Sequence, residues 1–143
     1  MKKILVICLT LLIAMSAIAF SGCGVKSVAE GEPVDLYAIP DGCEFVPHDQ
    51  FRRGYALLCD TSPDAVPINM DVLEDAFGTE GYYFENSDVI EEGYIYKTYG
   101  WFSEESWIDG KIAVGVIFKA PEGTEDFVYY MYISQGITYE DVR

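Results

Sequence analysis

Residues 111–119 form the stretch KIAVGVIFK, which has the cleanest two-residue periodicity in the chain. Every second residue from Ile112 to Phe118 is a large apolar residue, and the stretch is bounded by Lys111 and Lys119. Successive side chains of a β-strand point to opposite faces of a sheet, so this pattern predicts a strand with one buried face. Asp109-Gly110 before the stretch is a turn sequence.

Runs on both sides of this stretch predict further strands separated by short turns. An aromatic run at 94–102 precedes it, and an apolar run at 127–134 follows it. Earlier in the chain, residues 34–39 and 54–59 predict two more strands, and residues 43–46 predict a short edge piece. Runs of about eight residues separated by Gly, Pro and Asp turns are typical of an antiparallel sandwich or barrel.

Residues 68–77 admit two interpretations. Asn69 could cap a helix that places Leu73 and Phe77 on one face and ends at a glycine. Alternatively, a strand could lead into a hairpin turn at residues 75–78. Periodicity alone favours the helix, although the segment is short.

Composition bounds the class of protein. The chain has 143 residues and a formal net charge of −15, and half of its residues are apolar. This length predicts one domain, and the apolar share excludes a disordered acidic tail. The acidity argues against nucleic acid as a partner, because binding to phosphates needs clustered Lys and Arg.

The N-terminus has the pattern of a secretory signal peptide. Lys2 and Lys3 precede an apolar run that extends to Phe20. The run is at or below the lower limit for a membrane-spanning helix and ends in small residues, so it predicts a cleaved signal rather than a permanent anchor.

The residues Phe20-Ser21-Gly22-Cys23 resemble the bacterial lipoprotein box, although Leu is more usual at the first position. The resemblance implies cleavage after Gly22, a lipid on Cys23, and a protein anchored to the cell membrane on its extracytoplasmic face. Two or more acyl chains hold a domain stably on a membrane. Ordinary secretion with a plain Cys23 thiol, or an uncleaved helix, remain the alternatives.

The expected organisation has three parts: a signal peptide at 1–22, a tether at 23–33 and a single domain at 34–143. Cleavage would remove 22 residues with two lysines and no acids, which leaves 121 residues with a net charge of −17. Such a charge keeps a surface-tethered protein soluble and repels anionic polymers.

Cys43 and Cys59 are the two cysteines left for the domain. An even pair in an oxidising compartment predicts a disulfide, and two buried free thiols are the alternative. A bridge would close a short loop and stabilise the fold by roughly 3 kcal/mol.

Residues 54–133 contain an order of turns and strands that resembles a known family. The stretches CDTSPDAVPI at 59–68, VLEDAFG at 72–78 and GKIAVGVIFKAP at 110–121 carry the resemblance. They are similar to the telokin-like, immunoglobulin-like domains appended to signal peptides in many small bacterial lipoproteins. The resemblance implies an all-β, immunoglobulin-like antiparallel β-sandwich, and it favours a strand and turn over a helix at 68–77. The function of that family is largely unassigned.

The sequence offers no constellation that predicts catalysis, a cofactor or a metal site. His48 is the only histidine and lies between Pro47 and Asp49 in a predicted loop. Pairs of acidic residues are expected by chance in so acidic a chain, and the Asp-rich pattern of a calcium loop is missing. We therefore expect a non-enzymatic protein.

Aromatic residues are the one feature that exceeds composition. Tyr94 and Tyr96 would share one face of a strand, and Tyr99 and Trp101 would share the other, with Trp107 following. Some of these rings should point outward, where aromatic clusters mark binding surfaces. A Tyr-rich core is the alternative interpretation.

These five residues are our candidate binding residues. We expect them to bind another surface protein, or alternatively a cell-wall carbohydrate or a small ligand.

Overall fold

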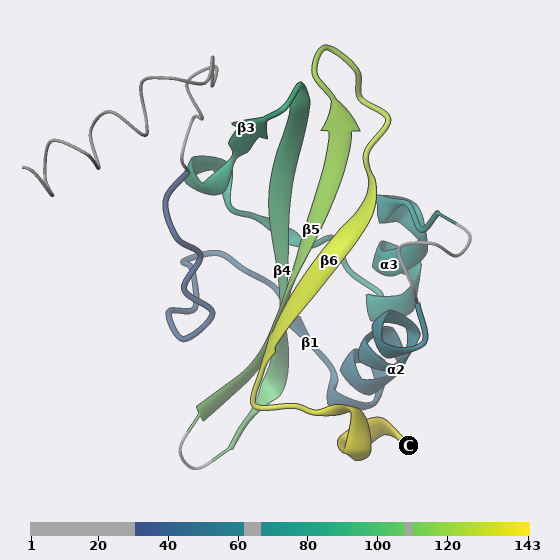
Figure 1. The fold of residues 1–143 in the computed structure, drawn as a ribbon. Coiled ribbons are helices and arrows are strands. Elements are labelled where there is room, and N and C mark those ends of the chain that lie inside the picture. The colour runs from purple at the N-terminus through teal and green to yellow at the C-terminus, as the bar shows by residue number, and fades with distance from the viewer. Residues whose placement is uncertain (1–30, 62–66, 108–109) are drawn as a thin grey trace, which may run out of the picture.

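The computed structural model describes residues 31–61, 67–107 and 110–143, and of residues 106, 107, 110 and 111 it describes the backbone only. Six strands within these residues form one mixed sheet (Figure 1). Its strand order is β1-β4-β5-β6, and β2 and β3 also pair with β4. The strands are β1 (Phe45–Val46), β2 (Tyr82–Tyr83), β3 (Val89–Glu91), β4 (Tyr94–Trp107), β5 (Gly110–Pro121) and β6 (Val128–Gln135).

The three long strands β4, β5 and β6 form an antiparallel meander. β4 and β5 pair along almost their whole length, with one irregularity between Phe102 and Ser106. β5 and β6 pair with one irregularity between Ile117 and Phe118. The short strands β2 and β3 pair antiparallel with β4, whereas β1 pairs with it in parallel.

The predicted strands at 94–102, 111–119 and 127–134 are confirmed, as is the short edge piece at 43–46, which contains β1. The alternation in β5 has the predicted consequence. Its even-numbered residues from Ile112 to Phe118 all belong to one buried cluster, because they share one face of the sheet.

Helix α2 (His48–Cys59) lies where the sequence predicted a strand at 54–59, so that prediction was wrong. Its buried residues Phe51, Tyr55 and Leu58 recur at helical spacing and line one face of the helix. The apolar run at 54–59, which predicted a strand, is the second half of this helix. A short apolar run has no periodicity that separates the two states.

Helix α3 (Met70–Phe77) realises the first interpretation of residues 68–77. The Asn69 side chain accepts a hydrogen bond of 3.2 Å from the backbone N–H of Val72, which caps the helix. Gly78 ends it in the left-handed conformation, with φ of 75°. The strand and turn that the family resemblance favoured here are not formed.

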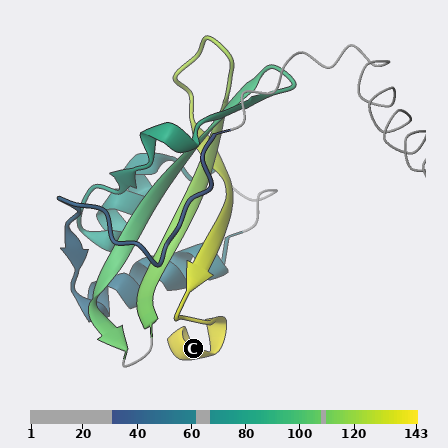
Figure 2. The same cartoon turned by 90° about the vertical axis from the view of Figure 1, so that its left-hand side faces the viewer.

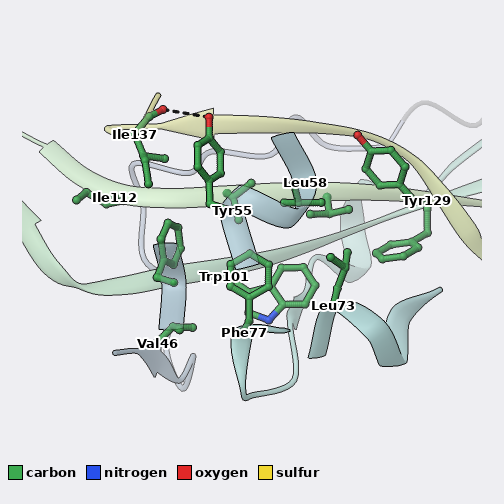
Figure 3. Packing of buried hydrophobic residues seen from close by; sticks show 13 residues of the cluster. Val46, Tyr55, Leu58, Leu73, Phe77, Trp101, Ile112, Tyr129 and Ile137 are labelled. Atoms are coloured by element: carbon green, nitrogen blue, oxygen red, sulfur yellow. Dashed lines mark hydrogen bonds between the residues drawn. The ribbon is translucent and has the colours of Figure 1, made fainter. Parts of the chain in front are cut away.

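Both helices pack on the same face of the sheet, which we call the covered face (Figure 1). The cluster beneath them is the main hydrophobic core, and Figure 3 shows part of it. The largest fully buried side chains of this core are Phe51, Leu58, Leu73, Phe77, Trp101 and Phe118.

The opposite face, which we call the open face, carries no helix. Residues 31–40, which we call the strap, run across part of it without forming the predicted strand at 34–39 (Figure 2). Leu36 of the strap is buried with Phe102 of β4 and Ala113 of β5 in a second, smaller cluster. Only part of residues 34–39 is buried, so an apolar run that looked like a strand is an irregular cover held by Leu36.

The prediction of a β-rich domain is confirmed, since the described residues form one six-stranded sheet with only two short α-helices and two 3-10 helices beside it. The finer prediction of an immunoglobulin-like sandwich requires a second sheet. Within residues 31–61, 67–107 and 110–143, helices α2 and α3 and the strap lie on the two faces of the single sheet.

Candidate functional site

Trp101, a predicted binding residue, is part of the main core. Its side chain is only 1% exposed and stacks on Phe77 of α3, with ring centroids 4.8 Å apart (Figure 3). The indole Nε1 donates a hydrogen bond of 3.0 Å to the backbone oxygen of Thr79. A ring held in this way cannot meet a partner, so the prediction for Trp101 was wrong.

Tyr99 also faces the helices. Its ring stacks on Tyr83 at a centroid distance of 5.0 Å and meets the edge of Phe118 at 5.8 Å. Burial, and then the negative charge of Asp88 and Glu74, raises the pKa of its hydroxyl. Tyr99 and Trp101 share one face of β4, as predicted, but that face is the covered one.

Tyr94 and Tyr96 lie on the open face, as the prediction of an outward site requires. The Tyr96 ring meets Tyr130 of β6 edge to face, with centroids 5.3 Å apart. The ammonium of Lys119 lies 5.5 Å from the centroid of Tyr94 and 4.9 Å from that of Tyr130. We call these four residues, Tyr94, Tyr96, Lys119 and Tyr130, the tyrosine cluster.

Two rings of the tyrosine cluster are exposed, and two acidic residues lie beside it. Tyr94 is 40% exposed and Tyr130 is 37% exposed. Burial raises the pKa of Tyr96, and the neighbouring Tyr130 and the carboxylates of Glu91 and Glu92 raise it further. A cation held over tyrosine faces is attracted by the ring quadrupoles, so Lys119 fixes the orientation of the rings.

Our sequence prediction missed Tyr130 and Lys119 as members of this site. Both follow from the pairing of β5 with β6, since Lys119 lies opposite Val128 and Tyr130 occupies the irregularity near Phe118. The extra residue of a bulge changes the face to which side chains point. The alternation in the sequence therefore could not assign Tyr130 to a face.

Trp107 ends β4, but its side chain lies outside the part of the chain that the structure describes. Cys23, the predicted lipidation site, lies outside it as well, together with the predicted signal peptide and most of the tether.

The apolar surface continues from the tyrosine cluster along β6. Met131 and Ile133 are exposed to about the same degree as Tyr130. Ile133 packs over Gly115 of β5, where Leu36 of the strap also approaches. The open face therefore presents large apolar side chains from β4 and β6, the two outer strands of the meander. This surface extends from the turn between β3 and β4 to the strap.

A groove of about 580 Å³ lies where this surface meets the strap. Residues 33–37 of the strap form one wall, and residues 133–136 at the end of β6 form the other. Both side-chain amide atoms of Gln135 are buried there without a hydrogen-bond partner among the described residues. Buried polar groups usually have a hydrogen-bond partner in folded proteins. A bound molecule or a water could supply the missing hydrogen bonds of this amide.

Cys43 and Cys59 are both free thiols, so the predicted bridge between them is not formed in this structure. Cys43 packs against the cluster that contains Leu36, on the open side of the sheet. Cys59 ends α2 and packs against the main core, with its sulfur 3.6 Å from the hydroxyl of Tyr132. The sheet separates the two clusters. Burial raises the pKa of the Cys43 thiol and reduces its reactivity.

His48 begins α2 instead of lying in the predicted loop. Its Nδ1 lies 3.2 Å from the Glu105 carboxylate, and its backbone N–H donates to Glu104 over 3.4 Å. The irregularity in β4 brings this acidic pair to the start of the helix, where a negative charge is favourable. These contacts give His48 a structural role at the N-terminus of α2.

The described residues contain no group of three or more His, Cys, Asp and Glu side chains suited to a metal ion. The helices among them are all too short or too polar to cross a membrane. Comparison with protein-family models, with curated protein sequences and with solved structures finds no match to this chain.

Proposed function

We propose that this protein is a non-enzymatic binding module that engages another surface protein through the tyrosine cluster on the open face. A lipid on Cys23 would hold it at the extracytoplasmic face of the cell membrane. Within the β-rich class, the immunoglobulin-like sandwich stays a prediction, and the proposed function does not depend on it.

The single observation that carries the proposal is the exposure of Tyr94 and Tyr130 beside Met131 and Ile133 on the face without helices. Contiguous exposed apolar surface on a soluble domain usually marks an interaction site. Tyrosine is enriched in such sites because it offers a large, stiff ring with a polar tip.

The electrostatics of the cluster support a partner with basic residues. Glu91 and Glu92 flank the rings, and the chain has a net charge of −15. Complementary charge raises the rate at which partners meet and excludes other acidic surfaces.

The test is crosslinking of the full-length protein in cells, followed by mass spectrometry of the captured proteins. We compare the native chain with Tyr94→Ala and Tyr130→Ala. Tyr139→Ala is the matched control, because Tyr139 is 42% exposed but lies in the 3-10 helix η2 (Tyr139–Val142) near the C-terminus. We expect one dominant partner, captured at least about fivefold less by each cluster variant, since central aromatic residues contribute about 1 kcal/mol or more.

Unchanged capture by folded Tyr94→Ala and Tyr130→Ala proteins would contradict the proposal. If no protein is captured and a panel of cell-wall glycans instead shifts the tyrosine fluorescence of the native chain, the carbohydrate alternative replaces it. That alternative can no longer use Trp101, which is buried.

The anchor has its own test. A Cys23→Ser variant should take up no labelled fatty acid, whereas the native chain and a Cys43→Ser variant should both be labelled. A native chain that takes up no label and keeps residues 1–22 would show that the apolar N-terminal run is an uncleaved anchor.

A further inference from the structure

β6 is the outermost strand of the sheet, and its outer edge is largely unpaired. In the strand order β1-β4-β5-β6 it has β5 on one side only. Among the described residues, the outer edge makes one backbone hydrogen bond, 2.8 Å from the Tyr129 N–H to the Ile68 oxygen. From Tyr130 onward, the N–H and C=O groups that point away from β5 can pair with another strand.

β6 also lacks the features that usually protect an edge. Its sequence, VYYMYISQ, contains no charged residue and no proline. Natural edge strands are commonly blocked by lysine, proline, bulges or a covering segment. In β6 the one bulge lies near Tyr130, at the end where Ile68 already occupies the edge. The remaining length is extended and makes no backbone hydrogen bond on its outer side to any described segment.

The groove beside this edge offers a place for a side chain of an added strand. Ile133 belongs to both the edge and the groove, whose opposite wall includes Val34 and Leu36 of the strap. Asp35 adds a carboxylate, and the Gln135 amide has a donor and an acceptor without a partner among the described residues. In strand addition, the backbone edge supplies affinity, and pockets for alternate side chains supply specificity.

Charge decides which kind of strand fits. Asp35 lies in the groove, and Glu125 and Asp126 are separated from the start of β6 by one residue. A second copy of the chain would bring another net charge of −15 to the same edge. Like charges at an interface oppose association, whereas basic side chains would be attracted.

We propose that an extended segment of the partner protein, with alternating apolar and basic side chains, adds to the outer edge of β6 as a further strand. One apolar side chain of that segment enters the groove between the strap and Ile133. The inference rests on the proposed function, because it describes how the same partner binds beside the tyrosine cluster.

The test uses a ten-residue peptide of alternating valine and lysine, blocked at both ends, with the full-length protein in detergent micelles. Amide hydrogen exchange reports which backbone groups the peptide protects. We expect slower exchange in residues 130–135 at saturating peptide. Two control peptides distinguish the causes: one has all backbone nitrogens methylated and keeps its charge, and the other has glutamate in place of lysine.

Neither control peptide should protect β6, because the first cannot form a strand ladder and the second is repelled. In the protein, Ile133→Lys should weaken binding of the valine–lysine peptide about tenfold, through lost apolar contact and like charge. Val72→Lys is the matched control, since Val72 is an exposed apolar residue on α3 that belongs neither to β6 nor to the lining of the groove. Thermal melting of both variants establishes that they remain folded.

Three results with the peptides would overturn the inference: equal binding of the methylated peptide, protection that spares residues 130–135, or no protection at saturating peptide. Protection of β6 without peptide that increases with protein concentration would show that a second copy occupies the edge, and would also overturn it.

The two proposals fail separately. If Tyr94→Ala reduces capture of the partner in cells but Ile133→Lys does not, the binding function stands and strand addition is wrong. If neither variant reduces capture, the proposed function itself is wrong, whatever the peptide does.

Discussion

The Cα of Gly54 in α2 faces the ring of Phe77 in α3 so closely that a methyl group on Gly54 would lie 2.5 Å from Cδ1 of that ring. The Phe77 ring cannot retreat, because Phe51 meets it at 5.6 Å and Trp101 stacks on it at 4.8 Å. The missing side chain at Gly54 is therefore what lets the two helices approach each other over the sheet.

We expect Gly54→Ala to lower the free energy of unfolding by about 1–2 kcal/mol, because overpacking outweighs the gain in helix propensity. Urea unfolding followed by circular dichroism measures the change. Ala56→Gly in the same helix is the control and should cost about 1 kcal/mol from propensity alone. A Gly54→Ala protein that is more stable than the native chain would show that the helices have room to separate.

Trp101→Ala should destabilise the domain by about 3–5 kcal/mol, since it removes a fully buried indole and leaves a cavity. It also leaves the Thr79 oxygen without the indole donor. Urea unfolding gives the loss, and Trp101→Phe, which keeps a ring, should lose less. If Trp101→Ala kept its stability and lost the partner instead, Trp101 would be a binding residue after all.

Cys43 and Cys59 should both react with an alkylating reagent in denaturant, to the same extent with and without prior reduction. Peptide mass spectrometry locates the adducts. A tryptic product in which the two cysteines are joined would show that the bridge forms in the cell despite the separation of their clusters by the sheet.

The stability of the domain should fall as the pH rises above about 10, the ordinary pKa of tyrosine. Burial raises the pKa of Tyr83 and of Tyr132 above that value, helped by the Asp88 hydrogen bond and by Cys59 respectively. Above pH 10 the unfolded chain releases these protons and the folded chain keeps them, so the unfolded state gains stability.

Thermal melting between pH 8 and pH 11 measures this loss. Tyr132→Phe should show a shallower decline than the native chain, and the exposed Tyr139→Phe should decline like the native chain. An equal decline in all three proteins would mean that other groups cause the alkaline loss.

The meander could be predicted because β4, β5 and β6 have alternating or aromatic runs that end at turns. α2 could not, because its apolar run from Gly54 to Cys59 is continuous, and its helical spacing appears only when Phe51 is included. α3 had a clear cap at Asn69 and a clear stop at Gly78, and the residues themselves favoured the helix. The family resemblance, not the chemistry of the segment, favoured the strand and turn that are not formed there.

The sequence predicted which aromatic residues of β4 share a face, but not which of the two faces meets solvent. Alternation correctly separated Tyr94 and Tyr96 from Tyr99 and Trp101, because parity along a strand is a local property. Which of the two faces is buried depends on where α2 and α3 pack, and that is a property of the whole fold. Without the helices, the sequence could not say which pair of rings meets solvent.

The two edges of the sheet differ in a way that limits assembly. From Tyr94 to Ser103, β3, β2 and β1 pair in turn along the outer side of β4, so most of that edge is occupied. A filament built by strand addition needs two usable edges on every copy, one to receive and one to give. Among the described residues, β6 is the one long edge strand, because the opposite edge consists of the short strands β1, β2 and β3, which disfavours growth beyond a first added strand.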